Sequence, residues 1–234
     1  MAIEYNISLD ETHEFKYRIE LDRAYDQTVL ATAPKWTRLE YQQCSNCPLK
    51  KEQFSHCPAA VDLHHVIEDF QGLPAIKKAL VKVRTPERDY SKQVSLEEGL
   101  RSLLGVIMAS SSCPVLGRLR PMAEQHLPFA SSQEFTLRAI SLYLARQYFN
   151  SREGRTADWE LKGLVATFQQ LQLVNQAFWQ RIHDTCEGDS NLKAFLTFFS
   201  MSSGMSYSLE VQLQKIRPSV MSAAISAKYA TSGA

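Results

Sequence analysis

The chain has 234 residues, a formal net charge of +1 and 44% hydrophobic residues. This length and composition allow a full hydrophobic core, in one large domain or two small ones, and exclude a disordered chain. The balanced charge gives no overall attraction to nucleic acid or anionic lipid, so we predict no nucleic-acid partner.

The sequence shows neither an export signal nor a membrane span. Residues 1–10 lack a basic region followed by an apolar run. No uninterrupted apolar stretch reaches the roughly 18 residues that a transmembrane helix needs. We therefore predict a cytoplasmic protein without membrane contact. Because disulfides are rare in a reducing cytosol, clustered cysteines there favour metal binding.

The N-terminal part alternates apolar and polar residues, as half-buried strands do. Two such runs, residues 3–9 and 15–21, flank a short polar link and predict an antiparallel hairpin. Further short strands are expected at residues 28–31, 36–41 and 80–85.

Helical patterns begin within this region and dominate after it. Residues 58–70 carry apolar side chains at roughly 3.6-residue intervals, and Gly72 with Pro74 ends this helix. Two serines, each followed three residues later by glutamate, predict capping boxes at the starts of later helices. The expected later helices begin at Ser95, at Ser131 with Glu134, at Ala157 and at Leu192, and Pro218 ends the last of them.

These elements predict an α+β fold, with a small N-terminal antiparallel sheet and a cysteine-rich segment followed by a predominantly helical C-terminal bundle. The boundaries are a β-rich region at 1–92, the bundle at 93–220 and a flexible tail at 221–234, expected to form one cooperative unit. Residues 195–199 are apolar around much of their helix. That pattern fits a buried helix, or a face for a protein partner or self-association through the C-terminal helices.

Four of the five cysteines form a pattern typical of metal ligands. The two-residue spacing of Cys44 and Cys47 lets one tight turn present two thiolates to one ion. Nine residues separate Cys47 from Cys57, and Cys113 follows much later. Proline follows three of the four, which favours a helix start with the cysteine at the N-cap, where the helix dipole stabilises a thiolate. We predict that these four cysteines bind one metal centre that joins sheet and bundle.

The identity of the metal stays open at this point. Four thiolates fit a closed, tetrahedral zinc site, and zinc is the first expectation. They also fit an iron–sulfur cluster, whose ligands are often followed by proline. Two readings need no metal: four ordinary buried cysteines, or a redox dithiol at Cys44 and Cys47.

Other residues near this pattern provide substitutes. His56, His64 and His65 can replace Cys113 as ligands if Cys113 lies elsewhere. Cys186 stands at the end of a helical stripe and is expected to be structural.

A catalytic interpretation is available for Cys113, as nucleophile, with His126 as its base. His126 lies in an irregular segment between two helices, but no third, orienting residue can be named. Phosphate-binding glycine loops and the HExxH motif are absent from the sequence. The leading hypothesis is therefore a non-catalytic metal-binding protein of regulatory or scaffolding type. The alternatives are an iron–sulfur or thiol-based redox sensor and, third, a thiol-dependent enzyme, so enzymatic activity is left open.

Four short motifs resemble those of a family of uncharacterised bacterial proteins of about this length. The resemblance implies no activity, but it groups the four cysteines with His126. The motifs are Gln43-Cys44-Ser45-Asn46-Cys47-Pro48-Leu49, His56-Cys57-Pro58-Ala59-Ala60, Ser112-Cys113-Pro114 and His126-Leu127-Pro128-Phe129-Ala130.

Overall fold

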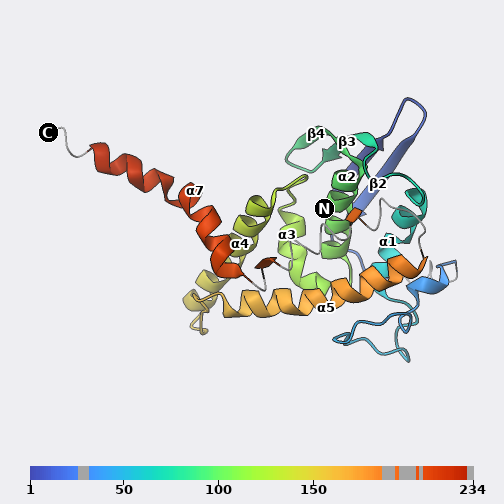
Figure 1. The fold of residues 1–234 in the computed structure, drawn as a ribbon. Coiled ribbons are helices and arrows are strands. Elements are labelled where there is room, and N and C mark those ends of the chain that lie inside the picture. The colour runs from blue at the N-terminus through green and yellow to red at the C-terminus, as the bar shows by residue number, and fades with distance from the viewer. Residues whose placement is uncertain (26–31, 186–192, 195–203, 206–207, 231–234) are drawn as a thin grey trace.

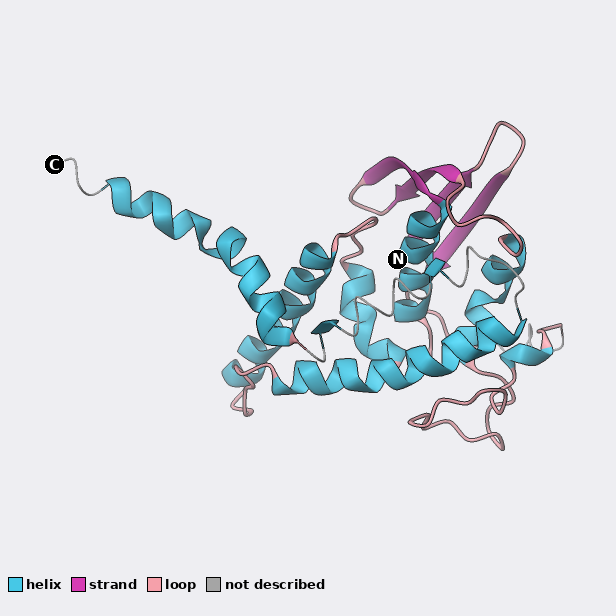
Figure 2. Ribbon diagram, in the orientation of Figure 1, coloured by secondary structure: helices cyan, strands magenta, loops and turns pink. Residues whose placement is uncertain are grey.

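In a computed structural model of the chain, the described residues are 1–25, 32–185, 193–194, 204–205 and 208–230. A four-stranded antiparallel sheet is followed by a mostly helical part, which confirms the predicted α+β fold (Figures 1 and 2). The strand expected at 28–31, the apolar run at 195–199 and Cys186 lie outside the described residues.

The sheet has the strand order β2-β1-β3-β4, with every neighbouring pair antiparallel. Its strands are β1 (Ala2–Ser8), β2 (Glu14–Glu20), β3 (Lys78–Arg84) and β4 (Asp89–Ser95). The predicted hairpin is confirmed, since Tyr5 pairs with Tyr17 across β1 and β2. The strand expected at 80–85 is β3.

Strand β4 was not predicted because its sequence lacks a clear period of two. Most of its residues are polar and exposed, and Val94 is the buried one that faces the core. It lies at the edge of the sheet, where exposed polar residues are tolerated and protect against pairing with other chains.

One face of the sheet packs against helix α2 (Leu96–Ser110), which in turn packs against α1 (Pro58–Asp69) (Figure 1). The inward side chains of the strands, among them Ile3, Tyr5 and Val81, are buried. Helix α2 approaches closely at Gly99, where a Cβ atom would lie 2.9 Å from Cγ2 of Val81. Glycine is therefore required there for this packing distance.

The remaining helices form the C-terminal part. They are η3 (Leu116–Leu119), α3 (Arg120–Glu124), α4 (Ser132–Arg152), α5 (Lys162–Thr185) and α7 (Leu209–Ala230). Ser95 accepts a hydrogen bond from the Glu98 N–H at the start of α2, and Ser131 with Glu134 forms a complete capping box before α4. These local caps confirm the two helix starts that the sequence predicted.

Helix α5 begins at Lys162 and not at the expected Ala157. The Asp158 carboxylate accepts a hydrogen bond of 2.7 Å from the Gly163 N–H, and Leu161 has a φ of 62°. A residue in the left-handed conformation cannot belong to a right-handed helix. Residues 157–161 therefore form a turn before the helix and are not part of it.

The strand expected at 36–41 is wrong. Residues Lys35–Thr37 form a 3-10 helix, η2, and an isolated bridge joins Arg38 to His56. The Pro34 carbonyl accepts from both the N–H and the hydroxyl of Thr37, which closes this turn. Trp36 and Leu39 are buried at a spacing of three residues, which is helical and not strand-like.

The expected helix end at Pro218 is also wrong, because Pro218 lies inside α7. Proline removes the hydrogen bond to the carbonyl four residues earlier, at Gln214. Both residues are exposed, so water can satisfy that carbonyl. The helix starts beside α4 and projects away from the body of the molecule, which also makes residues 221–230 helical (Figure 1).

Candidate metal centre

Cys44 and Cys47 lie in the irregular segment between η2 and α1. The Cys47 N–H donates to the Cys44 carbonyl at 3.0 Å, which closes the tight turn that the two-residue spacing predicts. Both side chains are half-buried. Cys44 and Cys47 are therefore more accessible to solvent than Cys57 and Cys113.

Cys57 is the N-cap residue of α1, with Pro58 at the first helical position, as predicted. Its N–H donates to the Thr37 carbonyl at 2.8 Å, which fixes the helix start against η2. The backbone N–H of Ala60, in the first turn of the helix, acts to lower the pKa of Cys57. This buried sulfur is thus held where free helix donors stabilise negative charge.

Cys113 lies in the turn between α2 and η3 and is buried. Its N–H donates to Oγ of Ser111 at 3.2 Å. Its sulfur accepts hydrogen bonds from the backbone N–H groups of Val115 and Leu116. Like Cys57, Cys113 therefore presents a sulfur supported by backbone donors, the type of outer-shell contact found around metal-bound thiolates.

The four cysteine thiols lie close enough to one another to interact electrostatically. Burial, together with the charges of Cys57, Cys113 and Cys47, raises the pKa of Cys44 to about 12. Burial, with smaller effects of Cys113 and Cys47, likewise raises the pKa of Cys57 to about 11. The pKa of Cys113 is raised by burial and by Cys47. An electrostatic interaction is therefore present between every pair of the four cysteines.

The spacing of the sulfurs is wider than a zinc tetrahedron. Within the described residues, three or more candidate ligand atoms lie within 4.8 Å of one another at His64, His65 and Glu68, and at no set of cysteines. A zinc ion with Zn–S bonds of about 2.3 Å holds its four sulfurs about 3.8 Å apart. All four are free thiols, so no disulfide accounts for their proximity.

A buried arginine completes this group. Arg181 of α5 is 1% exposed. Its positive charge lowers the pKa of Cys57 and Cys44 against the larger effect of burial. The guanidinium donates to three backbone carbonyls, while its Nε has no partner. These bonds reach the carbonyls of Trp36 at 2.6 Å, Arg38 at 2.9 Å and Leu39 at 3.0 Å.

The sequence interpretation missed Arg181, although one signal was present. Val174 and Phe178 belong to the apolar stripe of α5, and Arg181 follows Phe178 by three residues on the same face. A charged residue on a buried face needs a partner. The same helix also holds the cysteine segment through Asn46, whose amide donates to the Gln170 carbonyl at 2.9 Å.

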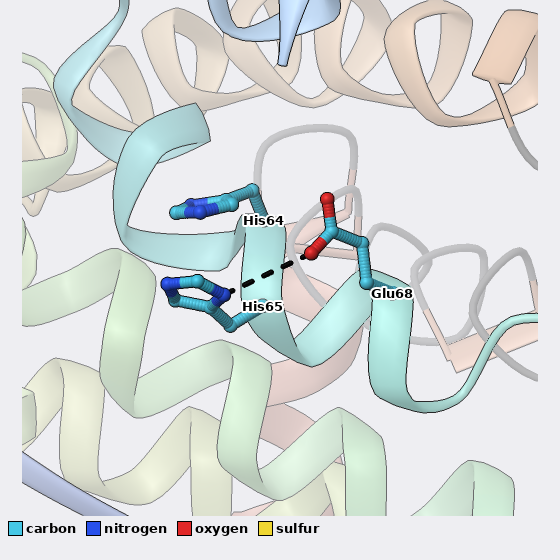
Figure 3. A group of neighbouring side chains, drawn as sticks. All are labelled: His64, His65 and Glu68. Carbon is cyan, nitrogen blue, oxygen red and sulfur yellow. Dashed lines mark ion pairs between the residues drawn. The ribbon is translucent and has the colours of Figure 1, made fainter. Parts of the chain in front are cut away.

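The three histidines considered as substitutes have partners of their own. His64 is buried, and its Nδ1 donates to the Val61 carbonyl at 2.6 Å. His65 and Glu68 are exposed and form a pair at 3.8 Å (Figure 3). His56 forms a hydrogen bond with Ser55. Two of the three residues in this group on α1 are exposed, whereas the four cysteines are buried or half-buried.

The two residues of the proposed thiol enzyme, Cys113 and His126, interact with different partners. Nε2 of His126 forms a hydrogen bond of 2.6 Å with the hydroxyl of Tyr5, while the Cys113 sulfur accepts from backbone N–H groups. A raised thiol pKa at Cys113 is also opposite to what a nucleophile requires.

Comparison with known proteins gives a family and no activity. A family model described as a domain of unknown function, DUF6901, matches residues 3–220. Neither a curated protein nor a solved structure matches the chain. Among the described helices, none combines the length and apolar character needed to cross a bilayer. Because the family model covers nearly the whole chain, the protein belongs to the DUF6901 family of unknown function.

Proposed function

We propose that Cys44, Cys47, Cys57 and Cys113 hold an iron–sulfur cluster, and that the protein is a non-catalytic, redox-responsive protein. The observation that carries the proposal is the proximity of four free thiols at a spacing wider than zinc requires. In a cubane cluster each thiolate binds a different iron atom, so the sulfurs stand further apart than around a single ion.

The charges around the cysteines support the same proposal. Four thiolates around a cluster leave a net negative charge in a buried place, which needs a compensating cation. Arg181 supplies that cation, since it interacts electrostatically with Cys57, Cys44 and Cys47. The orphan Nε of Arg181 is a donor available to a cluster sulfur.

A cluster of this kind supplies one-electron transfer at a potential set by its surroundings. The N–H groups of Ala60, Val115 and Leu116, together with Arg181, favour negative charge on the sulfurs and therefore raise that potential. With a cysteine on every iron, no coordination position is left for a substrate, so the protein's own residues point to sensing or electron exchange and not to catalysis.

A structural zinc ion is the second candidate. The Cys44–Cys47 turn, closed by a backbone hydrogen bond, favours it, because zinc sites commonly use two cysteines separated by two residues. Zinc requires the sulfurs to move together to about 3.8 Å. A zinc ion bound by the four cysteines would link the segment with Cys44, Cys47 and Cys57 to the turn after α2. The protein would then be of scaffolding or regulatory type.

The test is elemental analysis of the full chain purified without oxygen, combined with a visible absorption spectrum. We expect iron and sulfide in equal amounts, and a brown absorbance that bleaches on reduction. One zinc per chain without colour would replace the cluster by the structural ion. Protein that binds neither metal after anaerobic reconstitution would overturn the proposal of a metal centre.

A further inference from the structure

A second potential site lies on the other side of α2, where this helix meets α3, α4 and the loop between them. A mostly apolar pocket of about 80 Å³ opens there. Its walls include Val106, Leu119 and Met122, and its polar groups are Ser102, His126 and two arginines, Arg101 and Arg138. An apolar pocket with a few converging polar groups is the usual form of a small-molecule site.

Two of these polar groups, Ser102 and His126, are joined through Tyr5 by one chain of hydrogen bonds. The Phe129 N–H donates to Oγ of Ser102 at 3.2 Å, and the hydroxyl of Tyr5 lies 2.8 Å from that oxygen and 2.6 Å from Nε2 of His126. We assign the direction in which Ser102, which accepts from Phe129, donates to Tyr5 and Tyr5 donates to His126.

This direction of the chain fixes the state of the histidine. Burial, with the positive charge of Arg138, lowers the pKa of His126 to about 3, so the ring is neutral at physiological pH. A neutral ring that accepts at Nε2 carries its proton at Nδ1. His126 lines the pocket, and its Nδ1–H is therefore a donor available to a ligand.

Arg138 provides positive charge at the same pocket. Its Nη2 donates to the Met122 carbonyl at 2.9 Å, while its buried Nε has no partner. Glu134, one turn earlier on the same helix, interacts electrostatically with Arg138, and its carboxylate accepts a hydrogen bond from the Ser131 N–H in the capping box. Arg138 is thus a partly buried cation held by a carbonyl, without a carboxylate in an ion pair among the described residues.

The loop that closes the pocket is held in an uncommon backbone conformation. Phe129, which follows Pro128, has a φ of 60° although it is not glycine. Strained residues of this kind persist where surrounding contacts impose them, and they are concentrated at ligand sites. Here the Ser102 hydrogen bond to the Phe129 N–H imposes the conformation and places its ring at the pocket.

We propose that this pocket binds a short aliphatic monocarboxylate, with its carboxylate between Arg138 and His126 and its alkyl chain against the apolar wall. The Arg138 guanidinium and His126 both line the pocket, and guanidinium–carboxylate contacts are among the strongest polar interactions. A cavity of about 150 Å³ holds benzene, which has six non-hydrogen atoms as butyrate does, so a pocket of about 80 Å³ encloses about half of butyrate and leaves the rest at its open side.

The experiment is calorimetric titration of the full chain with sodium butyrate, and with butyramide as the uncharged counterpart. We expect butyrate to bind at least tenfold more tightly than butyramide. Arg138→Gln should weaken butyrate binding at least tenfold. Arg146→Gln, a change at an exposed arginine of the same helix, should leave it unchanged.

A second variant protects the test against a folding defect in Arg138→Gln. Ala130 lines the pocket and is partly exposed, so Ala130→Leu fills the space without touching either arginine. With an unchanged melting temperature it should also lose butyrate binding. The proposal is overturned by equal affinities for butyrate and butyramide, by no detectable binding, or by wild-type binding in folded Ala130→Leu. Metal content does not enter these outcomes, because the pocket shares no residue with the four cysteines.

Discussion

Arg181 and Arg138 each bring a guanidinium into the molecule from a long helix, and each has a buried Nε without a partner. Their surroundings nevertheless differ. Arg181 is 1% exposed and donates to three backbone carbonyls beside the cysteines, whereas Arg138 is only partly buried and donates to one. A cation enclosed on all sides suits a permanent anionic centre. A cation at the wall of an open pocket suits a ligand that exchanges.

Replacing one cysteine should have the largest effect and tests whether the region around Arg181 holds a metal centre. Cys57→Ser should abolish metal binding and lower the melting temperature by about 10 °C, because the free energy of a metal site is coupled to folding. Serine is a preferred N-cap residue, so the start of α1 stays capped and the loss reports on the metal. Metal analysis and thermal unfolding provide the measurement, with Cys186→Ser as the control that should keep its metal.

Removing the enclosed cation should have the next largest effect. Arg181→Met leaves three carbonyls without a donor and the anionic centre without its counter-charge, so we expect a loss of about 3 kcal/mol in unfolding free energy. The remaining cluster should show a reduction potential lower by on the order of 100 mV. Urea denaturation and redox titration measure the two effects. Arg152→Met, at an exposed position of α4, should change neither.

His126, at the pocket, should make the stability of the protein depend on pH. The folded-state pKa of His126 is depressed to about 3, so between that value and about 6.5 the unfolded chain binds a proton that the native state does not. Stability contributed by His126 is therefore complete above pH 6.5 and falls as the pH is lowered, by at most about 1.4 kcal/mol per unit.

Urea denaturation across this pH range tests the prediction. His126→Gln should flatten the pH dependence relative to the wild type. His65→Gln, at an exposed position, should not. A wild-type curve that His126→Gln leaves unchanged would show that the pKa of His126 is not depressed in the folded protein.

The smallest expected effect concerns the start of the helix that carries Arg138. Ser131→Ala removes the hydrogen bond to the Glu134 N–H and should cost about 1 kcal/mol in unfolding free energy. The neighbouring exposed Ser132→Ala serves as its control in the same denaturation experiment. Metal content should stay constant in both variants, and a change in it would mean that the two regions are coupled.

Features that depend on neighbouring residues could be predicted from the sequence. The hairpin of β1 and β2 follows from alternation over a few residues, and α2 and α4 begin where Ser95 and Ser131 cap them. Strand β4 depends on its partner β3, and η2 on a turn closed by Pro34, so neither had a sufficient local signal.

The same division holds at the two sites. The tight turn at Cys44 and Cys47 is encoded by their spacing, and the N-cap position of Cys57 by the proline that follows it. The proximity of Cys113 depends on how α2 packs, which no single segment encodes. The contacts of Tyr5 with Ser102 and His126 span 97 and 121 residues of sequence, so they emerge only from the folded arrangement.

The three carbonyls bound by Arg181 have a consequence for synthesis of the chain. The carbonyl of Leu39 receives its hydrogen bond from a residue 142 positions later. At a translation rate of roughly 5–20 residues per second, that donor emerges about 7 to 28 s after Leu39. Throughout this interval the nascent segment with Cys44, Cys47 and Cys57 lacks its anchor, and its thiols are open to oxidants and to any free metal.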